Sequence, residues 1–227
     1  MLSSKINSFS IWLIILGLSV VSIILIGGYT RISDSGLSIT EWLPVSGILY
    51  PVSEASWEIE FNKYKMIDQF MLVNSTMSLS EFKFIYFWEW FHRAFARLIG
   101  LIYIIPLTYL IISKKIPREY YYNVLLIGLL LSIQAIIGWY MVKSGLSGRV
   151  DVSQYRLSLH LTMAFIILGL IFYSLLKFIY HQKANEDLIK RNNFILTLFV
   201  LIFFQIIYGA FVSGTDSGLL YNTWPFT

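Results

Sequence analysis

The chain has 227 residues, of which 57% are hydrophobic and only 13% are charged, well below the roughly 25% charged residues of a typical soluble domain. Its net charge is +4, and it contains no cysteine. The balance of residues excludes a soluble globular protein, and the lack of cysteine excludes thiol catalysis, disulfide bonds and thiolate metal sites. We therefore expect an all-α membrane protein with no soluble domain and no nucleic-acid partner.

Five long apolar segments predict transmembrane helices, since a helix needs about 20 apolar residues to cross a bilayer. The first segment is too long for a signal peptide and lacks the small-residue cleavage pattern, so we expect it to be retained. The predicted fold is a transmembrane four-helix bundle plus a fifth helix. The segments are residues 6–30, 98–113, 120–142, 157–176 and 192–215.

The basic residues predict the orientation of these helices. If the helices alternate in direction, eight basic residues fall in short segments on one side. The opposite side holds a long loop with four basic and seven acidic residues, and a short loop with Lys143, Arg149 and Arg156. Cytoplasmic loops are rich in Lys and Arg, so we expect a cytoplasmic amino terminus in the cell inner membrane and an external first loop. The eight are Lys5, Lys114, Lys115, Arg118, Lys177, Lys183, Lys190 and Arg191.

Glycine-rich and aromatic segments follow the first apolar run. Residues 27–38 contain three glycines and predict an irregular, ordered loop. Aromatic and aliphatic residues then recur every three or four positions between Trp57 and Phe70. This spacing is typical of a helix lying in the membrane interface, although a loop helix packed on the bundle would have the same pattern.

The second transmembrane helix is expected to begin well before its charge-free part. Residues 98–113 are too few to span the bilayer core, and Ser78 with Glu81 three residues later has the pattern of a capping box. One helix over residues 79–112 would carry Glu89, His92 and the nearby arginines into the outer leaflet or to its edge.

An internal repeat is visible at long range. Asp34-Ser35-Gly36-Leu37 matches Asp216-Ser217-Gly218-Leu219, at an offset of 216 − 34 = 182 residues. The offset predicts a repeating unit of four helices with their loops. We expect residues 1–190 to form a first repeat with a substrate pocket, and residues 191–227 to begin a second, in which the chain ends early.

Two of the three histidines are candidate metal ligands. His92 lies 22 residues before Lys114, or about 33 Å along a helix, and His160 lies 17 residues before Lys177, or about 26 Å. Similar depth on two helices is what axial ligation of one heme iron requires. The alternative is that each histidine bonds a backbone carbonyl at the membrane interface. His181 has the setting of a solvated loop residue.

Small and charged residues surround the predicted pair. Small side chains one or two turns from the histidines leave a slot for a flat ligand, or serve close helix packing. Arginines nearby suit heme propionates, while Glu89 can reach either the pocket or Arg93. Gln134 is interpreted as packing and hydrogen bonding. The small residues are Ala96, Gly100 and Ala164, and the arginines are Arg31, Arg93, Arg97 and Arg156.

These residues, in this order and spacing, resemble the heme A synthase family, particularly its cysteine-free alphaproteobacterial and mitochondrial type. The resemblance covers nearly the whole chain. The motifs that carry it are Gly28-Tyr29-Thr30-Arg31, Ser35-Gly36-Leu37-Ser38, Glu41-Trp42-Leu43-Pro44, Glu89-Trp90-Phe91-His92-Arg93, Gln134 with Gly138-Trp139-Tyr140-Met141-Val142, Ser144-Gly145-Leu146, Tyr155-Arg156-Leu157 with His160-Leu161, and Gly209-Ala210 through Asn222-Thr223-Trp224-Pro225.

The resemblance implies eight helices in two pseudo-symmetric halves and the oxidation of the C8 methyl of heme O to a formyl group, giving heme A for cytochrome c oxidase. It implies that His92 and His160 bind the iron of the substrate heme, that Glu89 is catalytic, and that a second-half histidine pair holds a heme b cofactor. This chain has no counterpart of the second pair, so we expect it not to make heme A by itself.

The resemblance also implies partners. These are heme O, membrane lipid, heme O synthase and cytochrome c oxidase assembly factors, and the chain could form a homo-oligomer. Two other functions suit the same residues. One is a non-catalytic b-type heme-binding membrane protein, and the other is a four-helix transporter repeat whose outer charges gate a substrate.

Overall fold

Five long helices dominate the structure, a computed structural model that describes residues 7–180, 193–220 and 223. They are α1 (Ser8–Ile32), α4 (Leu79–Ile112), α5 (Tyr121–Gly145), α6 (Gln154–Tyr180) and α7 (Asn193–Gly214). All five are long and apolar enough to cross a membrane. The predicted all-α, multi-pass membrane architecture is confirmed.

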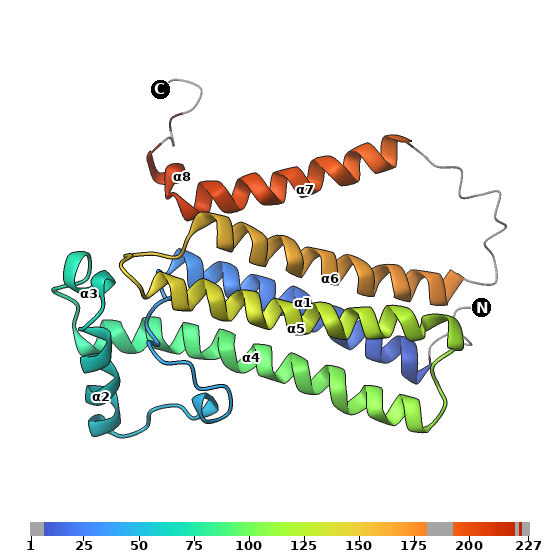
Figure 1. Ribbon diagram of the computed structural model, residues 1–227, viewed down its shortest axis with the longest axis horizontal. Coiled ribbons are helices and arrows are strands. Elements are labelled where there is room, and N and C mark those ends of the chain that lie inside the picture. The colour runs from blue at the N-terminus through green and yellow to red at the C-terminus, as the bar shows by residue number, and fades with distance from the viewer. Residues whose placement is uncertain (1–6, 181–192, 221–222, 224–227) are drawn as a thin grey trace.

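The long helices alternate in direction, so that their connections gather at two ends of the bundle (Figure 1). The long-loop end holds residues 33–78, the α5–α6 connection and the end of α7. The opposite end holds the starts of α1 and α5. Helix α1 packs against both α4 and α6, and α5 packs against α6 but meets α4 over few residues. Helices α4 and α6 therefore face each other across the bundle, with α1 behind and α5 in front in Figure 1.

Large apolar side chains fill the bundle toward the opposite end. Phe9, Leu13 and Leu16 of α1 are fully buried, and the indole Nε1 of Trp12 donates to the carbonyl of Ile102 at 3.0 Å. Small and polar residues replace this packing nearer the long-loop end. The remaining members of the buried cluster are Val20, Ile99, Leu107, Leu110, Ile116, Tyr120, Val124, Ile127, Ile167 and Ile171.

Helix α1 continues further than the glycines suggested. Gly27 and Gly28, predicted to lie in an irregular loop, are helical, and α1 ends at Ile32. The helix can continue there because a glycine lets its backbone approach a neighbouring helix closely. The chain then leaves the helix at Asp34, which has a left-handed φ of 50°, and Asp216 after α7 has a similar φ of 54°.

The segment between Trp57 and Phe70, where the aromatic spacing predicted one helix, is divided between two short helices. Helices α2 (Glu54–Tyr64) and α3 (Asp68–Leu72) are separated at residues 65–67. The aromatic face of α2 packs on the first turns of α4, which favours the alternative of a loop helix packed on the bundle. Helix α4 begins at Leu79 with the predicted capping box of Ser78 and Glu81. The packed residues are Trp57, Phe61, Tyr64, Phe82, Ile85 and Tyr86.

Three further short helices complete the described chain: η1 (Ser46–Ile48), η2 (Arg118–Tyr120) and α8 (Ser217–Leu220). The expected boundary between residues 190 and 191 lies outside the described residues, as do His181, Trp224 and Pro225. Helix α7 approaches α6 at the long-loop end, where a Cβ on Gly214 would lie 2.7 Å from the Cβ of Gln154.

Candidate functional site

The two predicted histidine ligands lie on helices that face each other across the bundle. His92 is on α4 and His160 is on α6. The Nδ1 atom of each ring is buried and has no hydrogen-bond partner within the part of the chain that the structure describes. A buried polar atom without a hydrogen bond costs free energy. One nitrogen of each ring is therefore available to bind a ligand from outside the described residues.

Each imidazole packs against a glycine of a neighbouring helix. A Cβ built on Gly27 of α1 would lie 3.0 Å from Cε1 of His92, and one on Gly138 of α5 would lie 2.9 Å from Cε1 of His160. Carbon atoms normally approach to about 3.5–4.0 Å, so any larger residue would displace the ring. The glycines thus fix where both imidazoles lie.

The donor set fits a heme iron. Among the described residues, no group of three or more His, Cys, Asp or Glu side chains could hold a bare metal ion. A porphyrin supplies four nitrogens of its own and needs only axial ligands from the protein. A Cβ on Gly100, two turns further along α4, would meet nothing within 4 Å, and the slot expected beside His92 stays a prediction.

Gln134 on α5 is the polar neighbour of His160. Its Nε2 donates to the His160 carbonyl at 3.0 Å and lies 3.4 Å from the Nε2 of the imidazole. The expected hydrogen-bonding role of Gln134 is confirmed. Its Oε1 is buried without a partner, so the amide retains one acceptor facing the site.

Glu89 ties the long loop to α4. The side chain is buried, with 4% of its surface exposed. One carboxylate oxygen pairs with Nη2 of Arg93 at 2.5 Å, and the other accepts hydrogen bonds from Ser38 Oγ at 2.7 Å and the Ile39 backbone N–H at 2.8 Å. The salt bridge considered from the sequence is therefore present, and both oxygens of Glu89 have partners.

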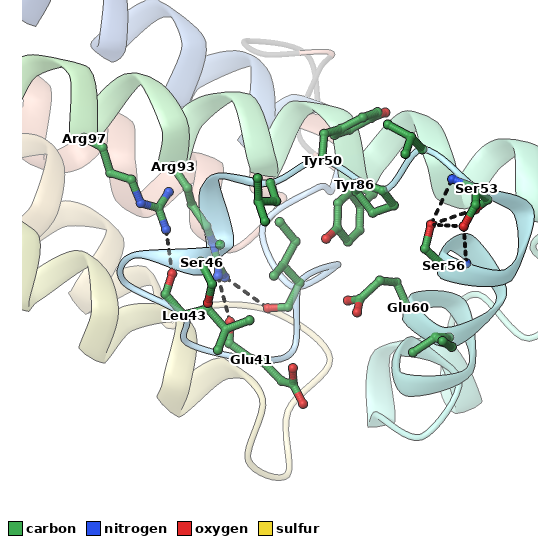
Figure 2. A pocket seen from close by; sticks show the side chains of 16 residues that line it. Glu41, Leu43, Ser46, Tyr50, Ser53, Ser56, Glu60, Tyr86, Arg93 and Arg97 are labelled. Atoms are coloured by element: carbon green, nitrogen blue, oxygen red, sulfur yellow. Dashed lines mark hydrogen bonds between the residues drawn. The ribbon is translucent and has the colours of Figure 1, made fainter.

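Arg93 and Arg97 bind the backbone of the same loop. Arg93 donates to the carbonyls of Ile39 and Glu41. Arg97 donates to those of Leu43 and Pro44, both at 2.9 Å. The two arginines lie one turn apart on α4, and Figure 2 shows both side chains reaching from α4 toward the loop. Nη1 of Arg97 is buried and has no partner.

Arg31 and Arg156 lie at other points of the long-loop end. The guanidinium of Arg31 pairs with Asp34, Asp151 and Asp216 at 2.7–3.0 Å and so joins the ends of α1, α6 and α7. Desolvation raises the pKa of Asp34 and Asp151, while Arg31 opposes the shift. Arg156 donates to Ser144 Oγ at 2.6 Å and stacks on the ring of Tyr140.

A cavity of about 370 Å³ lies between the loop and the start of α4 (Figure 2). Glu60, Tyr86, Arg93 and Arg97 contribute to its lining, and neither histidine does. The cavity is therefore separate from the histidine pair.

Comparison with known proteins places this arrangement in a family. Residues 10–227 match the COX15-CtaA family, described as cytochrome oxidase assembly protein. The chain belongs to this family. No solved structure matches.

Curated relatives of this cytochrome oxidase assembly family carry the name heme A synthase. The chain is 45% identical to that of Maricaulis maris (strain MCS10), over 98% of this chain and 65% of the relative. It is 43% identical to that of Parvibaculum lavamentivorans (strain DS-1), over 94% and 62%, and 44% identical to that of Flavobacterium psychrophilum (strain ATCC 49511), over 96% and 65%. The chain thus spans less than two thirds of the length of these relatives.

Two features of this member of the cytochrome oxidase assembly family were missed from the sequence. The roles of Gly27 and Gly138 as contacts of the histidines depend on which helices are neighbours, and the sequence does not specify this. Ser38 as a partner of Glu89 was also missed. Its only sequence signal is its place at the end of a conspicuous Ser-Gly-Leu-Ser motif.

Proposed function

We propose that this chain contributes the substrate site of a heme A synthase, in which His92 and His160 bind the iron of heme O from opposite faces. The observation that carries the proposal is the pair of imidazoles on α4 and α6, each with a buried nitrogen that has no hydrogen-bond partner among the described residues. The relatives' name supports the reaction. In that reaction the C8 methyl of heme O becomes the formyl group of heme A.

The chain's own residues would hold the flat substrate rather than transform it by themselves. Gly27 and Gly138 position the two rings. Among the four predicted propionate ligands, Arg97 is the best placed, because its Nη1 has no partner. Arg31, Arg93 and Arg156 each already bind protein groups, which would have to be shared with a propionate.

Glu89 is proposed as the catalytic or proton-handling residue. It lies one turn from His92, as in the motif that carries the resemblance, and a positioned carboxylate can transfer protons at a reacting centre. Its contacts with Arg93, Ser38 and Ile39 hold it in one place. A heme b cofactor would take its ligands from outside this sequence, which contains three histidines in all.

Location and partners follow from the same proposal. The excess of basic residues at the opposite end supports a cytoplasmic amino terminus, and we infer residence in the cell inner membrane. Heme O, supplied through the lipid by a heme O synthase, is the proposed substrate, and cytochrome c oxidase assembly factors and a second copy of the chain are proposed partners.

The test is to express the chain in cells that make heme O, purify it and record the spectrum of the bound heme. His92→Ala and His160→Ala should each remove or shift the low-spin bands that two imidazoles produce, while His181→Ala serves as the matched control. Wild-type spectra in both single variants would contradict the proposal.

Extraction and mass analysis of the bound heme separates the competing functions. Heme O, heme A or its alcohol intermediate supports a heme A synthase site. Heme b as the bound species would identify a non-catalytic b-type protein, which two axial histidines without an open iron position also suit. No heme at all would favour the transporter alternative.

A further inference from the structure

One segment of the long loop carries no charge and exposes apolar side chains. The apolar loop segment, residues 42–52, lies between Glu41 and Glu54. Its side chains are apolar and exposed to an extent unusual for a loop in water: Trp42 49%, Leu43 44%, Val45 82%, Ile48 50%, Leu49 75% and Val52 91%. A contiguous exposed patch of this kind marks an interaction surface.

The position of the segment along α4 gives its depth. Arg97, which binds the carbonyls of Leu43 and Pro44, lies fifteen residues before Ile112, the last residue of α4. That separation is about 22 Å at about 1.5 Å per residue, whereas the hydrocarbon core of a bilayer is about 30 Å thick. With Ile112 at the opposite boundary, the Cα of Arg97 lies about 8 Å inside the core on the long-loop side. The carbonyls that its side chain binds lie between that level and the membrane boundary, because helical side chains point toward the N-terminus of their helix.

One further contact agrees with this depth. Trp90, whose Nε1 donates to the carbonyl of Ile48 at 3.0 Å, lies 22 residues before Ile112, or about 33 Å, and so falls at the boundary. Any tilt of α4 shortens its projection on the bilayer normal and places Arg97 deeper. The segment therefore descends from the interface into the leaflet and returns.

Irregular backbone at such depth requires partners for its polar groups, because no water is present to supply them. Arg97 donates hydrogen bonds to two carbonyls of the segment, and Trp90 donates to a third. Within the segment, the N–H groups of Gly47, Ile48 and Leu49 donate to the carbonyls of Leu43, Val45 and Ser46. The polar groups turn toward α4, while the apolar side chains turn away from the protein.

We infer that the apolar loop segment is re-entrant and contacts lipid acyl chains in the leaflet on the long-loop side. Arg97 and Trp90 bind three of its carbonyls there. Trp42 at its start contacts Trp139 of α5, with ring centroids 6.4 Å apart, so the segment also connects α4 to α5 where these helices meet over few residues. The inference concerns the membrane surface of the protein and is independent of heme chemistry.

The native chain contains no cysteine, so single spin labels can be placed without background substitutions. Val45→Cys and Leu49→Cys are labelled in the full chain, in phosphatidylcholine and phosphatidylglycerol vesicles, with Asn62→Cys on the exposed polar side of α2 as the matched control. We expect the ratio of collision with oxygen to collision with a water-soluble nickel chelate to be several-fold higher at positions 45 and 49 than at 62. Nickel accessibility equal to that at 62 would place the segment in water. Shielding from both reagents would mean that protein covers it. Either result would overturn the inference.

Discussion

The contact of each histidine with a glycine allows a substitution test at the scale of one methyl group. Gly138→Ala places a Cβ 2.9 Å from Cε1 of His160, and carbon contacts relax to about 3.5–4.0 Å, so the imidazole must move by about 0.6–1.1 Å. Metal–ligand distances tolerate only about 0.2 Å. Overpacking of this kind costs about 1–3 kcal/mol, or about 5- to 150-fold in heme affinity.

Helix α1 offers a matched pair of positions for the same test. Gly27→Ala would bring a Cβ to 3.0 Å from Cε1 of His92, while a Cβ at the adjacent Gly28 would meet nothing within 4 Å. Both substitutions remove the same helical glycine penalty of about 0.5–1 kcal/mol. We expect Gly28→Ala to keep the wild-type heme spectrum with equal or greater thermal stability, and Gly27→Ala and Gly138→Ala to lose low-spin heme.

The assay is titration of the purified variants with heme O, followed by absorption spectroscopy. Thermal unfolding of the heme-free proteins separates a local displacement of the histidine from general misfolding. If Gly27→Ala and Gly28→Ala bind heme equally well, the packing of the imidazoles on glycine does not set their position, and the reasoning is refuted.

Three further predictions concern the charged residues. In a full-length protein, Glu89→Gln should keep heme O bound but lower the rate of heme A formation about 100-fold or more, with Glu81→Gln as the control. A normal rate of heme A formation in Glu89→Gln would show that Glu89 serves only as a partner of Arg93. Arg31→Gln should lower the free energy of unfolding by about 2–4 kcal/mol, because it leaves Asp34, Asp151 and Asp216 without this partner. Asp34→Asn should cost less than about 1 kcal/mol, since 69% of the Asp34 side chain is exposed and exposed ion pairs contribute little. Equal thermal stability of the two variants would disprove the central role of Arg31. An impermeant thiol reagent should label Ser53→Cys but not Glu119→Cys in intact cells, and the reverse pattern would invert the topology.

Local patterns in the sequence were reliable wherever one helix decided the outcome. The capping box of Ser78 and Glu81 placed the start of α4 at Leu79, and the spacing of Glu89 and Arg93 allowed the ion pair that forms. Such contacts depend on residues three or four apart on one helix, so the sequence alone specifies them.

Local patterns failed where neighbouring helices intervened. Glycine composition suggested a loop at Gly27, but the helix continues to Ile32, because the glycine accommodates His92 from α4. The aromatic period from Trp57 to Phe70 is interrupted at residues 65–67, because the loop has to turn in order to pack α2 on α4.

The sequence by itself determined that the chain is a bundle of membrane-spanning helices with two histidines at similar depth, since hydropathy and the helical rise are properties of single segments. It also identified the arginines near that depth. Only the tertiary structure decided which residues meet. Helices α4 and α6 face each other, Gly27 and Gly138 hold the imidazoles, and all four arginines bind carboxylates, hydroxyls or loop carbonyls. These contacts join residues far apart in the chain, and the packing of whole helices fixes them.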